Sequence, residues 1–277
     1  MGSYVEYAPP PELARVVRTV WIQTVGDTPY VQRHLPTGGV EIHVPIGDSP
    51  RMLGPLTGPR IDLIPAHTTV IGMRFWPGAA PSLPATLDDL LDQHVQLSDL
   101  LGTSADRLAE SVAGAPSAQH ALVMLERHML SAVRESAPQD PGVAEAVQLL
   151  LPWQPVEISA TARHLGLSAS QLRRRFLSSV GVGPKTLQRT LRFQGFLALA
   201  QAGAAASGRR GADGMAGLAV DVGYADQAHL SRECVRITGV TPTALLGGDI
   251  ERCVCGHDHT ASFQPFLRTR ASPSRRL

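Results

Sequence analysis

The chain has 277 residues, which is long enough for two domains because domains mostly span about 100–200 residues. Hydrophobic residues make up 43% of it, enough to form buried cores. Its net charge of +1 is unevenly divided. Residues 1–150 contain 9 Arg, no Lys and 16 Asp plus Glu, a net of −7, whereas residues 151–277 contain 16 Lys plus Arg and 8 acids, a net of +8. This asymmetry predicts a polyanion-binding domain joined to a second, acidic domain.

Composition also excludes several classes of protein. No apolar run approaches the roughly 18 residues of a membrane span, and the N-terminus lacks a charged region followed by an apolar one. Three cysteines cannot build a disulfide framework. We therefore expect a cytoplasmic protein with no membrane partner.

The first 80 residues contain short β-type runs separated by Gly- and Pro-containing turns, at 15–25, 40–46, 61–64 and 68–75. Many short strands with such turns predict a small barrel or sandwich. Helical spacing of apolar residues begins at Leu87 in "LDDLLDQHVQLSDLL" and returns at 119–133 and 143–151. The predicted fold class is therefore α+β, with a β-rich N-terminal domain followed by helices.

The expected division of the chain has four parts. They are a β-rich sensor or dimerisation domain with trailing helices at 1–137, a helix and linker at 138–156, an all-α domain at 157–247, and a largely unstructured tail at 248–277. Within the all-α domain, the Gly- and Ala-rich stretch 202–214 predicts a flexible linker instead of a continuous helix.

The basic half contains a duplication with an offset of 58 residues. The pattern Arg174-x-Phe176-x4-Gly181-Val182-x-Pro184 is matched by Arg232-x-Cys234-x4-Gly239-Val240-x-Pro242. Each copy begins with a short apolar-patterned helix, continues through a glycine turn and ends with a second helix. Two helix-turn-helix units are therefore predicted.

The second helix of each copy has a clear start. Ser168 is a good N-cap and Gln171, three residues on, completes a capping box, while Asp226 holds the same repeat position as Ser168. Residues at i, i+3 and i+4 project together on a helix. The candidate base-reading residues are Ser170, Gln171, Arg173 and Arg174 in the first copy, and Gln227, His229, Ser231 and Arg232 in the second.

The run "QLRRRF" has two interpretations. An isolated triplet of arginines is usually an ordinary solvated helix face. Arginine, however, bonds bidentately to guanine, and an α-helix fits the major groove of B-DNA. Duplication, capping and the charge of the C-terminal half together favour an interface with double-stranded DNA.

Residues 157–246 resemble the DNA-binding domain of the AraC/XylS family of transcription regulators. The resemblance rests on "GYADQAHLSRECVRITGVTPTAL", in which Gly223, Tyr224, Asp226, Leu230, Gly239 and Pro242 are among the residues that fit. It implies two helix-turn-helix units joined by a long helix at 185–203, with recognition helices in successive major-groove segments. It also implies a regulator and not an enzyme.

Three departures from the family pattern have expected consequences. Cys234 stands where the family usually has an aromatic residue, which should weaken local packing, and Thr161 replaces a leucine. The stretch 202–214 is longer than usual.

The candidate phosphate contacts are Lys185, Arg189 and Arg192, because basic side chains and helix N-termini both favour anions.

The acidic half resembles the N-terminal β-rich domain of some AraC-type regulators, in the runs "LPTGGVEIHVPIG" and "IGMRFWPGAA". That resemblance implies an effector-binding or dimerisation role, so a small-molecule effector and a homodimeric partner are expected. Arg74 lies in an apolar strand and needs a partner there, either an effector carboxylate or an internal pair with Glu41 or Asp62, and we favour the internal pair.

Two clusters keep alternative functions open, although no cofactor is predicted. A metal set of His34, Glu41, His43 and His67 would make the N-terminal domain a metal-dependent enzyme or sensor, but scattered polar residues on a half-exposed strand are the more frequent explanation. In the tail, Cys253, Cys255, His257 and His259 have the ligand types of zinc and would suit metal or redox sensing. Their spacing does not match a known zinc motif.

Overall fold

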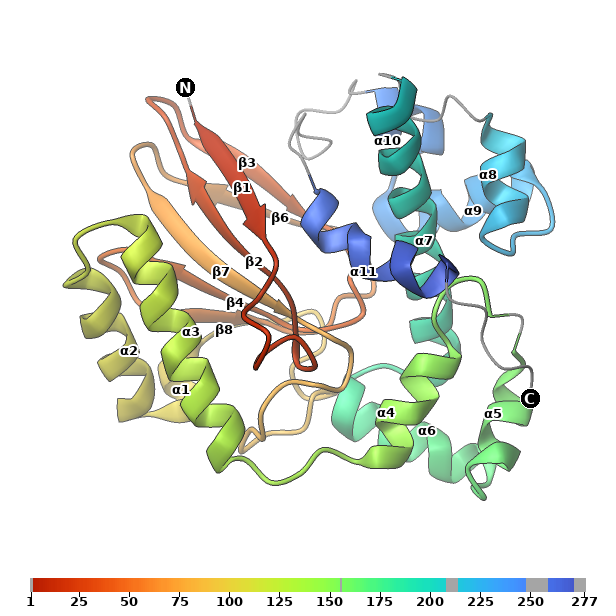
Figure 1. Ribbon diagram of the computed structural model, residues 1–277, viewed down its shortest axis with the longest axis horizontal. Coiled ribbons are helices and arrows are strands. Elements are labelled where there is room, and N and C mark those ends of the chain that lie inside the picture. Colours follow the sequence, from red (N-terminus) through yellow and green to blue (C-terminus); the bar gives the residue numbers. More distant parts are fainter. Residues whose placement is uncertain (1, 155, 208–213, 248–258, 272–277) are drawn as a thin grey trace.

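A computed structural model describes residues 2–154, 156–207, 214–247 and 259–271. Figure 1 shows a β-sheet domain followed by a helical C-terminal domain, so the predicted α+β class is confirmed. Of the two predicted forms, barrel or sandwich, the closed barrel is wrong, because the described strands form an open six-stranded sheet, in the order β1-β2-β7-β4-β5-β8, and a separate β3-β6 ribbon. The strands are β1 Ser3–Tyr7, β2 Val17–Thr24, β3 Tyr30–His34, β4 Glu41–Pro45, β5 Arg51–Leu53, β6 Arg60–Ile64, β7 Thr69–Phe75 and β8 His94–Gln96.

The centre of the large sheet is covered on both faces. Strand β2 is buried along seven of its eight residues, three of which, Arg18, Thr19 and Gln23, are polar or charged. Helix α3 (Ala118–Glu135) packs on β2 and β7, and helix α11 (Thr260–Ala271) packs on β1 and β2. Trp21 lies opposite Gly72 in the β2–β7 register, and a Cβ on Gly72 would lie 2.1 Å from the Trp21 ring, so the glycine makes room for the indole.

The segment from Leu87 to Leu101 is not the helix that its spacing predicts. It forms turns, then β8, then the short helix α1 (Leu97–Leu101). Strand β8 pairs with β5, with Leu53 opposite His94, so its conformation depends on a distant partner. Helix α2 (Thr103–Ala113) follows, and α3 agrees with the helix predicted at 119–133.

The C-terminal domain contains helix α4 (Pro141–Leu149), two helix pairs and the helix that connects them. The pairs are α5 (Ile158–His164) with α6 (Ala169–Val180), and α8 (Met215–Asp221) with α9 (Gln227–Thr238), followed by α10 (Pro242–Gly247). The connecting helix α7 spans Pro184–Ser207, so a flexible linker beginning at residue 202 is wrong for residues 202–207. Residues 208–213 of that expected linker lie outside the described residues. Each unit has its own apolar core, one around Phe176 and the other around Cys234.

Part of the tail that was expected to be unstructured is helical. Helix α11 lies between the β-sheet and α7 (Figure 1), and its Phe266 is fully buried. The apolar periodicity of α11 is weak and Pro265 lies inside it, so packing against two neighbours stabilises it more than sequence propensity does. Within the described residues, no helix has both the length and the hydropathy needed to cross a membrane.

Candidate functional site

The first helix-turn-helix unit is built as its sequence predicts. Gly166 takes a left-handed conformation (φ 65°) in the turn between α5 and α6. Ser168 Oγ accepts a hydrogen bond from the Gln171 backbone N–H (3.2 Å), and Gln171 Oε1 accepts one from the Ser168 N–H (2.8 Å). Because the Gln171 side chain completes this capping box, it stabilises the start of α6 in addition to its expected contact with bases.

The exposed face of α6 carries two arginines, Arg173 and Arg174, that form no ion pair within the described residues. Ser170, Arg173 and Arg174 are exposed, whereas Leu172 and Phe176 are fully buried on the opposite side. Arg175 lies 3.5 Å from Asp140 at the start of α4. For Arg173 and Arg174, the described part of the chain provides no hydrogen bond or ion pair, so both guanidinium groups remain available to an anion.

The second unit has the same plan with different side chains. The Asp226 carboxylate accepts from the His229 backbone N–H (2.6 Å) and caps α9. Gln227 and Arg232 are exposed, and Ser231 is half-buried. The His229 ring packs edge-on against Tyr224 at 5.2 Å between centroids, and its Nδ1 accepts from the Ala225 N–H (3.3 Å).

The three candidate phosphate contacts on α7 have unequal surroundings. Lys185 is exposed near the start of the helix. Arg189 Nε donates to Glu233 Oε2 (2.5 Å), which ties α7 to α9, and the Arg192 guanidinium lies 5.6 Å from the centroid of the Tyr224 ring. Arg189 and Arg192 therefore hold the second unit on the connecting helix.

A cavity of about 140 Å³ lies between the β-sheet domain and the C-terminal helices. Its walls combine charged side chains from the strands with apolar side chains from α7, α10 and α11. They include Arg18, Arg74, Leu197, Leu245 and Phe263. Both domains therefore contribute to one cavity.

Arg18 is the unusual residue of this cavity. It is only 2% exposed, and its Nε and Nη1 atoms are buried with no hydrogen-bond partner. Burial, reinforced by nearby Arg74, lowers the pKa of Arg18 to about 9. Arg18 lies inside the run "RVVRTVWIQTV", so it has the same sequence signal as Arg74, an arginine within a β-type run, although it was not among the predicted site residues.

Arg74 forms the internal pair expected for it, with Glu41 and not with Asp62. Its Nε donates to Glu41 Oε1 (2.7 Å) and its Nη2 lies 3.3 Å from Oε2, while Nη1 contacts Glu6 Oε1 (3.3 Å) and Ser262 Oγ (2.6 Å). Burial alone would raise the pKa of Glu41, but Arg74 and then His43 hold that pKa well below its usual value. This network connects β1, β4 and β7 with α11.

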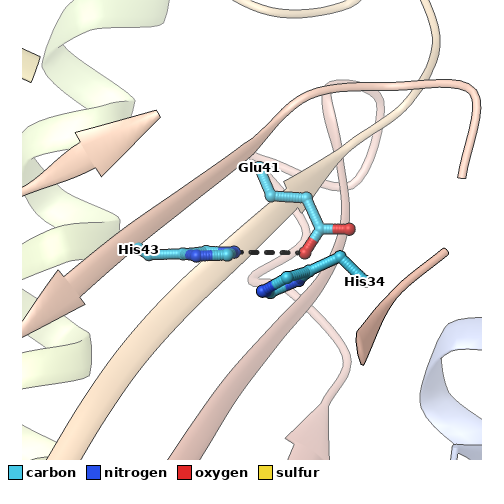
Figure 2. A group of neighbouring side chains, drawn as sticks. All are labelled: His34, Glu41 and His43. Atoms are coloured by element: carbon cyan, nitrogen blue, oxygen red, sulfur yellow. Dashed lines mark hydrogen bonds and ion pairs between the residues drawn. The ribbon is translucent and has the colours of Figure 1, made fainter. Parts of the chain in front are cut away.

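Beside this network, His34, Glu41 and His43 form a group whose ligand atoms all lie within 4.8 Å of one another (Figure 2). Burial lowers the pKa of His43 to about 4, so the ring is neutral at pH 7. His67, the fourth residue of the expected set, is instead 74% exposed in its side chain and lies near Asp27. The residue that sequence reasoning missed is His94, whose Nδ1 lies 3.3 Å from Asp62 Oδ2, as His34 Nε2 does at 3.4 Å.

The candidate cluster of the tail is only partly described. Cys253, Cys255 and His257 lie outside the described residues. His259 precedes α11, and its Nδ1 lies 2.9 Å from Glu6 Oε1. His259 thus contacts the start of the β-sheet domain.

Two capped helix-turn-helix units on one connecting helix, with a basic face on the first, define a double helix-turn-helix DNA-binding protein. Residues 161–247 match a family described as "Helix-turn-helix domain", and residues 5–96 match a "Domain of unknown function (DUF6597)". Residues 161–247 are therefore a helix-turn-helix domain of the AraC type.

Among solved structures, the chain is similar to ToxT from Vibrio cholerae. ToxT of strain SCE256 with a bound unsaturated fatty acid is 16% identical, with 89% of this chain and 94% of that chain covered and a TM-score of 0.41. ToxT of strain O395 bound to (E)-4-(8-methylnaphthalen-1-yl)but-3-enoic acid is 12% identical, with 89% and 98% covered and a TM-score of 0.42. No curated protein matches the chain.

Proposed function

We propose that the chain is a DNA-binding transcription regulator of the AraC family, that it acts in the cytoplasm and that it has no enzymatic activity. It reads DNA with α6 and α9 in successive major-groove segments about 34–36 Å apart, one turn of the duplex. The observation that carries the proposal is the pair of exposed arginines, Arg173 and Arg174, on a capped helix with no partner in the described structure. Arginine at such a position discriminates guanine by bidentate hydrogen bonds. Ser170 and Gln171 flank these arginines, and Gln227, His229, Ser231 and Arg232 form the second reading face.

The test is selection of bound sequences from a random duplex pool at physiological salt. Wild-type protein is expected to recover two short elements about one helical turn apart, and Arg173→Ala/Arg174→Ala protein to lose the first element only. Arg107→Ala/Arg127→Ala protein is the matched control, because it also loses two exposed arginines but in the β-sheet domain. Equal enrichment by all three proteins would exclude base readout by α6.

Phosphate contacts are proposed for Lys185, Arg189 and Arg192. Their internal contacts suggest a ranking, in which Lys185 binds the backbone most directly and Arg189 acts through the position of α9. Lys185→Ala should weaken binding to specific and random duplexes alike and reduce the salt dependence of affinity by about one unit of slope. An effect restricted to one sequence would contradict this assignment.

We also propose that a small-molecule effector with a carboxylate or similar anionic group occupies the cavity between the domains. A buried guanidinium with two unpaired N–H donors is costly, and an anion would satisfy both. The apolar side chains of Leu197, Leu245 and Phe263 suit an apolar body on the same molecule. Because both domains line the cavity, an occupant would bind one domain arrangement better than another and shift the DNA-competent population.

This effector proposal is tested by thermal unfolding and calorimetry with a panel of small carboxylic acids and their amides. Wild type and Arg15→Gln, an exposed control two positions from β2, should bind the acids and not the amides. Arg18→Met should lose acid binding, yet be no less stable without ligand, because the buried donors are removed. Equal binding of acids by wild type and Arg18→Met would exclude the site.

A homodimer is the oligomer that we propose, through the outer face of the β3-β6 ribbon. Val31, Ile61 and Leu63 are 41%, 57% and 68% exposed, and Val31 lies directly opposite Leu63 in the register. Exposed apolar residues grouped on one ribbon face are typical of an interaction surface. Ile61→Glu/Leu63→Glu should convert a dimer into a monomer in light scattering, and unchanged mass would contradict this surface.

A further inference from the structure

Three potential metal ligands converge beside the β-sheet although they come from different parts of the chain. His34 ends β3, whereas Glu41 and His43 lie on the same face of β4. Figure 2 shows the His43 ring pointing at the Glu41 carboxylate and the His34 ring lying next to both. All three side chains are largely buried, so their polar atoms face one another and not bulk water.

The distance between His43 and Glu41 is long for a hydrogen bond and suitable for shared coordination. His43 Nε2 lies 3.4 Å from Glu41 Oε2, longer than the usual 2.7–3.2 Å of an N–H···O bond. In a tetrahedral site with ligands roughly 2.0–2.2 Å from zinc, neighbouring ligand atoms are about 3.3–3.6 Å apart. Since every ligand atom of the group lies within 4.8 Å of the others, small side-chain movements are enough to complete such a site.

We propose that His34, Glu41 and His43 bind one divalent transition-metal ion of the zinc class. Imidazole nitrogen and carboxylate oxygen are both established zinc donors, and two histidines with one carboxylate are a known zinc ligand set. The set leaves one coordination position for water or a small ligand. The occupant of that position, and not the ion, is therefore exchangeable.

The surroundings of the three ligands resemble an outer coordination shell. Asp62 Oδ2 lies 3.4 Å from His34 Nε2, and a carboxylate in that place orients the ring so that its other nitrogen is presented to a metal. Arg74 holds Glu41 mainly through Oε1, at 2.7 Å, which leaves Oε2 as the more weakly held oxygen. Asp62 thus fixes the orientation of His34, and Arg74 fixes that of Glu41.

Access to the ion is provided by a cavity of about 720 Å³ that His34, His43, Asp62 and His94 line. His94 Nε2 is buried with no hydrogen-bond partner, and the His94 ring packs edge-on against His43 at 5.5 Å between centroids. An unpartnered buried nitrogen next to the ligands is unfavourable without an additional group. A metal-bound water in this cavity would supply one.

The experiment uses the full chain with Cys253→Ser/Cys255→Ser, which removes the only competing thiol pair, after treatment with a chelator. Titration with Zn²⁺ in competition with a colorimetric chelator is expected to give one bound ion per chain. Co²⁺ should give visible d–d absorption without a sulfur charge-transfer band. His43→Ala should lower the Zn²⁺ affinity more than about 100-fold, since loss of an outer-shell partner alone lowers it 10–100-fold.

His67→Ala is the matched control, because His67 belongs to the same domain but is exposed and outside the group. It should bind Zn²⁺ as the parent does. Thermal unfolding of His34→Gln gives a second measurement in case His43→Ala fails to fold: Zn²⁺ should raise the Tm of the parent and of His67→Ala but not that of His34→Gln. Less than a tenth of an equivalent bound, or equal affinity in the parent and both ligand variants, would overturn the proposal.

Discussion

The two helix-turn-helix units have one backbone plan and different side chains. In both, a Ser or Asp cap starts the second helix and a left-handed glycine, Gly181 or Gly239, ends it. The first unit then buries Phe176 and exposes two adjacent arginines, whereas the second buries the smaller Cys234 and holds its His229 against Tyr224. Duplication has therefore preserved the residues that define the frame, while the core and the reading face have diverged.

The two units also contact the β-sheet domain differently. The first is joined to it by a backbone hydrogen bond from the Leu87 N–H to the Ser178 carbonyl (3.0 Å). The second receives a hydrogen bond from Arg33 Nη1 to the Thr238 carbonyl (3.3 Å). A side-chain contact at 3.3 Å breaks more easily than an embedded backbone bond, so we expect the second unit to move more readily relative to the sheet.

The largest difference between the units should appear in their cores. Phe176→Ala should lower the free energy of unfolding by about 3–5 kcal/mol, because a fully buried aromatic side chain is lost and a cavity remains. Cys234→Ala removes one atom from the equivalent position and should cost only about 1 kcal/mol. Urea unfolding followed by circular dichroism measures both, and similar losses would mean that the two cores are equally well packed.

The next difference concerns base readout by the second unit. Arg232→Ala should reduce discrimination by roughly 1–3 kcal/mol, and only in the second element of the bound sequence. The exposed Arg107 is the control, because Arg107→Ala removes the same charge from the β-sheet domain. Competition binding with duplexes mutated in one element at a time measures the effect, and a loss spread over both elements would contradict separate readout.

The smallest difference should come from the caps. Ser168→Ala and Asp226→Ala should each lower stability by about 1 kcal/mol, within a range of roughly 0.5–2 kcal/mol, since each leaves a backbone N–H of the first turn without its acceptor. Ser168→Asp retains an acceptor and should restore most of the loss. Chemical unfolding of the four proteins compares them, and a loss in Ser168→Asp equal to that in Ser168→Ala would show that capping is not responsible.

The helix-turn-helix domain was predictable because its signals are local. The caps and the turn glycines lie within a few residues of the helices they specify. Together with the duplication at an offset of 58 residues, they identified α6 and α9. The exposed arginines of α6 followed from helical geometry alone. Whether these side chains touch bases stays a prediction.

The errors have a common physical cause, which is dependence on distant partners. Residues 87–96 have helical spacing, yet His94 to Gln96 are strand because β5 offers free backbone groups. Helix α11 has a weak pattern and is stabilised by Phe266 inserting between other elements. For the same reason the sequence suggested His67 as a ligand and missed His94, which only the folded sheet brings next to His43.

Helix α11 also affects the order in which the parts of the protein complete their folding during translation. The Ser262 N–H donates to Glu6 Oε2 (3.0 Å) although 256 residues separate them. At roughly 5–20 residues per second, about 13–50 s of translation pass between the two ends of this contact. The side of β2 that α11 covers, together with Arg18, therefore stays uncovered while the DNA-binding domain is being synthesised. The cavity between the domains is therefore completed last, and the effector binding that we propose for it has to follow the folding of both domains.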